Sequence, residues 1–247
     1  MLHSVDLQLE PNEASDLAEI HEPGLLDAHG WDHAFLTVLD EGPVENCIAM
    51  LGHEEGAGLT DGWSSHRLTF DALDGEGRTE DAEAVAVRDG RVYVLGSHYG
   101  SKDGPLEAKR HFVARFDQSE LAEGLEGCTP VLEIARTRFR LHRAINDALA
   151  ASGIELFELA PGAREALIDA TIKRGRKKDK GWVDFVDPGD LPINLEGAAF
   201  GADGALHLGL RFPTTAEGQP LVVAVPDVDA LFDDPRAVPA CGDGWWL

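Results

Sequence analysis

The chain has 247 residues, of which 43% are hydrophobic, and it carries a formal net charge of −24. This length suits one large domain or two small ones, and the 27 glycines and 13 prolines fit a loop-rich β protein better than a helical bundle. So large a negative charge repels nucleic acid and anionic membranes, which we therefore exclude as general partners.

The terminus and the cysteines both favour a cytoplasmic protein. The first residues contain no basic region followed by an apolar run, so we expect no signal peptide. No stretch approaches the ~20 apolar residues that span a bilayer. Cys47, Cys128 and Cys241 are widely spaced and odd in number, which predicts reduced thiols without a metal-type spacing.

The first third of the chain predicts strands separated by turns. Residues 33–39, 46–51 and 65–70 are apolar or β-branched runs bounded by Gly, Pro or Asp. Residues 81–97 then form a motif with an acidic residue, a spacer, a glutamate, an apolar strand, the turn Asp89-Gly90 and a second strand. Because glycine accepts positive φ, Asp-Gly between two apolar runs predicts a β-hairpin.

The pattern changes after two further predicted strands at 111–116 and 130–135. Leu141, Ile145 and Leu149 are spaced four apart, which predicts a helix over 139–150 that ends before Gly153. A second short helix is predicted at 161–172, followed by a basic loop at 173–180. We interpret residues 137–180 as a helical insertion within one β domain that spans residues 1–247.

The insertion is basic although the chain is acidic. Residues 136–180 contain eleven of the 21 Lys and Arg residues but only six of the 45 Asp and Glu residues. One interpretation is a solvated segment that neutralises an acidic neighbour in the same molecule. The other is a site for phosphate or carboxylate groups, so we expect a small anionic molecule or a protein partner to bind there.

The hairpin motif occurs a second time at 194–211, with its turn at Asp203-Gly204. Strands are also predicted at 221–225 and at the aromatic end, 245–247. A unit repeated within one chain indicates an architecture built from repeated units.

The two copies resemble a bacterial family described as domain of unknown function 3616. The resemblance rests on the glutamate motifs and on the strand ends Gly96-Ser97-His98 and Gly209-Leu210-Arg211, with Asp40-Glu41-Gly42 as an early turn. It implies an all-β, β-propeller-like fold, distantly similar to esterase-like phytases and propeller lactonases. We expect about five or six blades, in a ring that need not be complete. The resemblance implies no established reaction, since fold alone does not give function.

Each copy carries two oxygen-bearing side chains two residues apart. Asp81 and Glu83, and likewise Asn194 and Glu196, are predicted to share one face of a strand. In a propeller these four residues would converge near the central channel, where hard oxygen ligands suit Ca²⁺ or Mg²⁺. The alternative is structural: Asp and Asn bond local backbone amides at strand starts, and a buried glutamate can accept backbone bonds between blades.

Arg211 and His98 are the candidate catalytic residues. Arg211 ends the second copy, where it could bind an anionic substrate group or form a salt bridge. Ser97 and His98 point to opposite faces of a strand and cannot pair directly, and the chain has no Gly-x-Ser-x-Gly elbow.

Two functions are therefore predicted. The first is a divalent-cation-assisted hydrolase of phosphate or carboxyl esters or of lactones, in which the metal polarises the ester and activates water. The second is a non-catalytic binding or interaction scaffold, in which the glutamates are structural and the insertion meets a partner.

Overall fold

The chain folds as two compact units. Unit 1 comprises residues 1–94 and 114–134, and unit 2 comprises residues 95–113 and 135–247. The computed structural model describes residues 4–10, 13–73, 78–101, 104–234, 236–242 and 245–246.

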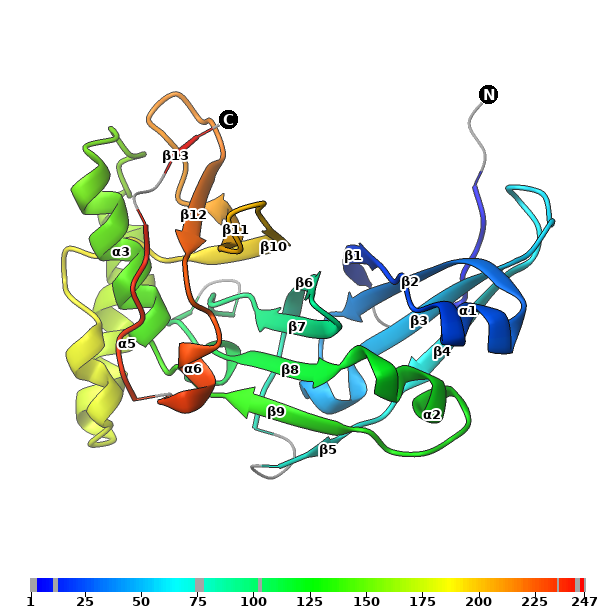
Figure 1. Cartoon of the computed structure of the whole chain (residues 1–247). Coiled ribbons are helices and arrows are strands. Elements are labelled where there is room, and N and C mark those ends of the chain that lie inside the picture. Colours follow the sequence, from blue (N-terminus) through cyan, green and yellow to red (C-terminus); the bar gives the residue numbers. More distant parts are fainter. Residues whose placement is uncertain are drawn as a thin grey trace. The chain divides into compact units, whose positions relative to one another are not determined.

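A four-stranded antiparallel sheet in unit 1 follows the order of the chain (Figure 1). Its strands are β1 (Ala14–Glu19), β2 (Trp31–Leu39), β3 (Ile48–Glu54) and β4 (Trp63–Leu68). The strand β3 is buried along nearly its whole length, whereas β1 and β4 at the two edges are mostly exposed or half-buried. The predicted strands at 33–39, 46–51 and 65–70 are confirmed within a few residues.

A five-stranded sheet, chiefly in unit 1, has the order β5-β9-β8-β7-β6. Its strands are β5 (Asp71–Ala72), β6 (Ala82–Arg88), β7 (Arg91–Gly96), β8 (Val113–Asp117) and β9 (Val131–Ala135). The predicted hairpin is confirmed, since Asp89 and Gly90 both have positive φ, at 50° and 76°, as a tight turn between strands requires. The strand β5 pairs parallel with β9, a long-range pairing that no hairpin signal predicts.

The sheet of unit 2 contains the second copy of the motif. Its strands, in order, are β10 (Asn194–Phe200), β11 (Leu206–Phe212), β12 (Leu221–Val225) and β13 (Trp245–Trp246). Every second residue of β11 and β12 is buried, which is the alternation of a sheet with one covered face. The predicted terminal strand is confirmed at Trp245–Trp246, and Leu247 lies outside the described residues.

Unit 2 also contains the main helical segment. It comprises α3 (Arg140–Ser152), α4 (Pro161–Arg164), the π-helical turn η4 (Glu165–Asp169), α5 (Ala170–Lys177) and the 3-10 helix η5 (Gly181–Phe185). Unit 2 also has the short elements η2 (Ala108–Arg110) and α6 (Ala230–Asp233). The short elements of unit 1 are α1 (Pro23–His29), η1 (Val44–Asn46), η3 (Gln118–Glu120) and α2 (Leu121–Leu125). Gly153 ends α3 with φ of 69°, as its sequence position predicts.

The helices of unit 2 are held by an apolar cluster. Its buried members are Leu106, Phe139, Leu167, Ile168, Ile172 and Val186, and Trp182 packs against it. The cluster contains residues from the segment before η2, from the start of α3, and from η4 and α5. The helical segment is therefore an integral part of the core of unit 2.

The predicted all-β propeller is wrong. The structure is mixed, with 26% helix and 33% strand, and its three sheets are separate and unclosed. A propeller repeats one kind of antiparallel sheet around a central channel, whereas here one of the three sheets has five strands with a parallel pairing, and the helices of unit 2 pack around an apolar cluster of their own. The description of the chain as one domain with an insertion at 137–180 stays a prediction.

Both predicted helices are confirmed, but the predicted loop at 173–180 is helical as far as Lys177. All three cysteines are free thiols, as expected. Among the described residues, no helix has both the length and the apolar composition needed to cross a bilayer.

Substitution at Ile172 tests how far the helical segment depends on its core. Ile172 is 5% exposed, so Ile172→Ala should lower the free energy of unfolding by about 2–5 kcal/mol through lost burial and a cavity. The neighbouring Lys173 is exposed, so Lys173→Ala should change it by less than about 0.5 kcal/mol. Urea unfolding of both variants checks this, and equal effects would contradict the packing described.

Candidate functional site

A cationic pocket lies in unit 2 between the segment 106–109 and the segment 174–182, at the end of α5 and the start of η5. Its volume is about 350 Å³. Its lining residues are Leu106, Glu107, Ala108, Lys109, Arg174, Lys178, Lys180 and Trp182. We call it the basic pocket, because four of these residues are cationic and one is acidic.

Two contacts fix the segment 106–109 against α5. Arg174 binds Glu107 with both guanidinium nitrogens, Nη1 to Oε1 at 2.5 Å and Nη2 to Oε2 at 3.0 Å. These hydrogen bonds raise the pKa of Arg174. The amide of Leu106 donates to Thr171 Oγ1 at 2.8 Å. Arg174, paired with Glu107, thus forms part of the wall of the basic pocket. The exposed side chains of Lys109, Lys178 and Lys180 form its rim.

Lys109 lies close to other cationic side chains. Desolvation, followed by repulsion from Arg110 and Arg174, lowers the pKa of Lys109. Lys178 and Lys180 are exposed on the opposite segment. A bound anion would relieve this repulsion, because its charge interacts favourably with every lysine at the rim.

Trp182 forms an apolar wall of the basic pocket and is itself supported from behind. Its ring centroid lies 4.7 Å from that of Phe139, with 34° between the planes. One edge of the indole lies over Gly175 in α5, where a Cβ atom would approach Trp182 Cη2 and Cζ3 to 2.8 Å. The absence of a side chain at Gly175 therefore gives the indole its position.

Three fully buried histidines lie beyond Phe139. The ring of His111 is 3.9 Å from Phe139 and 4.6 Å from His98, with 25° between the two imidazoles. The ring of His142 is steeply inclined to those of His111 and Phe139, at 69° and 82°, with centroid distances of 5.9 Å and 5.8 Å. The rings from Trp182 through Phe139 and His111 to His98 form one continuous stack, which we call the ring column.

Burial keeps the inner imidazoles neutral. Desolvation, with a smaller contribution from His142, lowers the pKa of His98 to about 3. Desolvation and the neighbouring histidines hold the pKa of His111 well below its ordinary value. Among the described residues, the four ring nitrogens of these two histidines have no hydrogen-bond partner. Both side chains thus pack as flat aromatic rings.

Asp190 ties α3 to the segment that precedes β10. Its carboxylate accepts from Arg143 Nη1 at 2.6 Å and from the amide of Asp187 at 2.9 Å, and Oδ2 lies 3.6 Å from His142 Nε2. Burial raises the pKa of Asp190, but His142, the Asp187 amide and Arg143 together hold it below its ordinary value. The carboxylate is therefore charged, and it lies close to the imidazole of His142.

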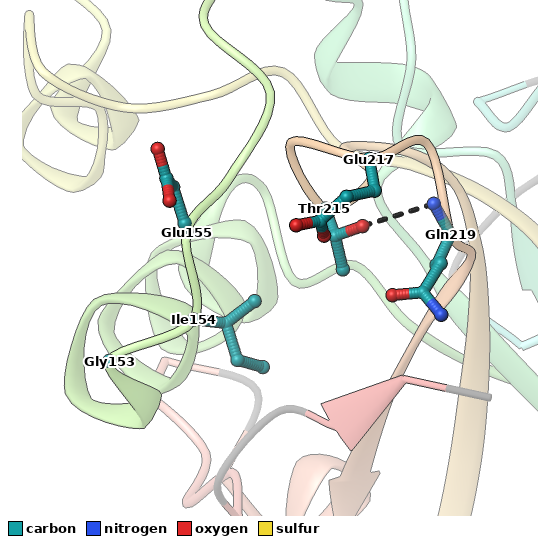
Figure 2. A pocket seen from close by; sticks show the side chains of 6 residues that line it. All are labelled: Gly153, Ile154, Glu155, Thr215, Glu217 and Gln219. Atoms are coloured by element: carbon teal, nitrogen blue, oxygen red, sulfur yellow. Dashed lines mark hydrogen bonds between the residues drawn. The ribbon is translucent and has the colours of Figure 1, made fainter.

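A larger hollow in unit 2 has the opposite charge. It has a volume of about 620 Å³, and Figure 2 shows Glu155 on one side, with Thr215, Glu217 and Gln219 on the other. The dashed line is the hydrogen bond from the Gln219 amide to Thr215 Oγ1, at 3.0 Å. Because both of its charged residues are exposed glutamates, this hollow is unsuited to an anion.

Three of the residues predicted from the motif lie together in unit 2. Asn194 Nδ2 donates to Glu196 Oε1 at 3.2 Å, and Arg211 Nη1 donates to the same oxygen at 3.1 Å. The pairing of β10 with β11 is irregular on both sides of Leu195. The predicted salt bridge of Arg211 is confirmed, and the side chain of Arg211 is 71% exposed.

The other two predicted ligands belong to unit 1, where Asp81 and Glu83 are half-buried at the start of β6. Across the described parts of the chain, no three His, Cys, Asp or Glu residues are grouped in a way that could hold a metal ion. A role for Ca²⁺ or Mg²⁺ at Asp81, Glu83, Asn194 and Glu196 stays a prediction, as does a catalytic role for Arg211 or His98.

The sequence indicated the cations of the basic pocket but neither its aromatic wall nor the ring column. For the Lys and Arg run at 173–180, an anion site was one of two interpretations, and it rested on charge alone. The imidazoles of His111 and His142 are both fully buried. Only the tertiary packing around Phe139 brings them together.

Comparison with known proteins adds no family: no family model matches the chain, and no curated protein matches it. The resemblance to domain of unknown function 3616 therefore stays a prediction.

The ring column makes the stability of unit 2 sensitive to acid. His98 is neutral when folded but takes up a proton near pH 6.5 when unfolded, so its contribution is complete above that pH and is lost as the pH falls. The loss should be about 1.4 kcal/mol per pH unit between pH 6.5 and the folded pKa. His98→Gln should flatten the dependence of the urea midpoint on pH between 7 and 5.

His21→Gln is the matched control, because the side chain of His21 is 77% exposed. It should leave the pH dependence of the wild type unchanged. Parallel curves for the wild type and His98→Gln would contradict the neutral, buried imidazole.

Proposed function

We propose that the protein binds a small molecule with phosphate or carboxylate groups in the basic pocket. The observation that carries this proposal is the concentration of Lys109, Arg174, Lys178 and Lys180 around one hollow, in a chain whose net charge is −24. This is the binding function, rather than the hydrolase, of the two predicted from the sequence.

The local charge outweighs the charge of the whole chain at this position. At physiological ionic strength, charges more than about 8 Å apart are largely screened, so a ligand in the hollow interacts chiefly with its lining residues. Arg174 is paired with Glu107, so the net positive charge of the lining equals that of its three lysines, Lys109, Lys178 and Lys180. An anion with two or more charges is the best complement to them.

The size of the hollow favours a small ligand. A volume of about 350 Å³ lies within the range of small-molecule sites and is lined by both apolar and cationic groups, as such sites are. A long polyanion would also approach the many carboxylates elsewhere on the surface, and their repulsion opposes its binding. A short organic anion avoids that cost.

The Lys178→Gln/Lys180→Gln double variant tests this function with pyrophosphate as the probe. Loss of two charge-assisted contacts should weaken binding by at least about tenfold in isothermal titration calorimetry. The same charge is removed by Lys173→Gln/Lys177→Gln, which alters the same basic run outside the pocket lining and should leave binding within about twofold. Equal loss in both variants, or no binding in the wild type, would overturn the proposal.

A further inference from the structure

The basic pocket has an apolar wall as well as a cationic rim, and both determine which ligands fit it. Ala108 and Trp182, both half-buried, line it beside the lysines. Inorganic anions gain nothing from such a wall, since only a ligand with its own apolar surface benefits from covering it. The wall therefore favours a ligand that has an apolar part as well as charged groups.

Trp182 is positioned in advance of any ligand. Phe139 lies against the indole at 4.7 Å, and Gly175 leaves room for its edge. Phe139 in turn contacts His111 in the ring column and His142 beside it, and all three are fully buried. A ring fixed in this way loses little conformational freedom when a ligand stacks on it, so the contact adds to affinity at small entropic cost.

From this arrangement we infer that the ligand of the basic pocket is a flat aromatic or heteroaromatic ring joined to a phosphate group, such as a nucleoside monophosphate. This inference rests on the proposed anion-binding function. The ring stacks on the indole of Trp182, and the phosphate lies between Lys109 on one segment and Lys178 and Lys180 on the other. The two halves of the ligand meet two walls that belong to the same pocket.

The test compares two phosphate-bearing probes, one with an aromatic base and one without. Adenosine monophosphate and ribose 5-phosphate both carry a sugar and one phosphate, and only the first carries a base. Stacking on an aromatic side chain should make adenosine monophosphate bind at least about tenfold more tightly in calorimetry. Binding of the base should also change the fluorescence of Trp182.

Variants separate the two halves of the site. Trp182→Leu should remove the advantage of adenosine monophosphate and leave the affinity for ribose 5-phosphate within about twofold. Trp182→Phe keeps a ring in the core, so it guards against misfolding and should retain part of the advantage. Lys178→Gln/Lys180→Gln should weaken both probes to a similar extent.

The outcomes distinguish this inference from the function on which it rests. Equal affinity of the two phosphates in the wild type, or an advantage that survives in Trp182→Leu, would overturn the ring-phosphate ligand and leave anion binding intact. Absence of pyrophosphate binding to the wild type would overturn the proposed function itself. A tenfold preference that depends on Trp182 would support both.

Discussion

The contact between Phe139 and Trp182 is the interaction on which the site of unit 2 depends. Phe139 begins the first long helix, contacts two buried histidines and supports the indole that lines the basic pocket. Its position has a backbone cost, because Arg138 and Phe139 both have positive φ, at 45° and 73°. Non-glycine residues in this region are strained by about 1–2 kcal/mol each. Burial of the whole Phe139 ring offsets that strain.

Much of the local structure follows from the sequence, whereas the arrangement of the sheets does not. Apolar runs bounded by Gly, Pro or Asp located the strands, and Asp89-Gly90 located a hairpin, because both signals depend on neighbours in the chain. The parallel pairing of Asp71–Ala72 with β9 joins segments about sixty residues apart, and no local pattern specifies it. A repeated hairpin therefore indicates two similar local units without fixing whether their sheets close into a ring.

In the candidate site, too, the features that depend on neighbours in the chain were predicted, whereas those that depend on tertiary packing were not. Two-residue spacing predicted that Asn194 and Glu196 would lie together, and their side chains do form a hydrogen bond. The run at 173–180 was predicted as a loop because of its charge, yet Lys and Arg are good helix formers and Ile172 anchors the helix in the core. The burial of His98 and His111 depends on rings brought in from α3 and η5, so it could not be predicted from the residues that flank them.

Gly175 carries a consequence for how this chain can change over time. Its hydrogen atom is all that the edge of the Trp182 indole allows at that point of α5, although alanine would suit the helix better. The two positions, seven residues apart, are therefore expected to change together in evolution. A lineage that acquires a side chain at 175 must first exchange its tryptophan for a smaller residue, and one that keeps the tryptophan keeps the less favourable glycine within its helix.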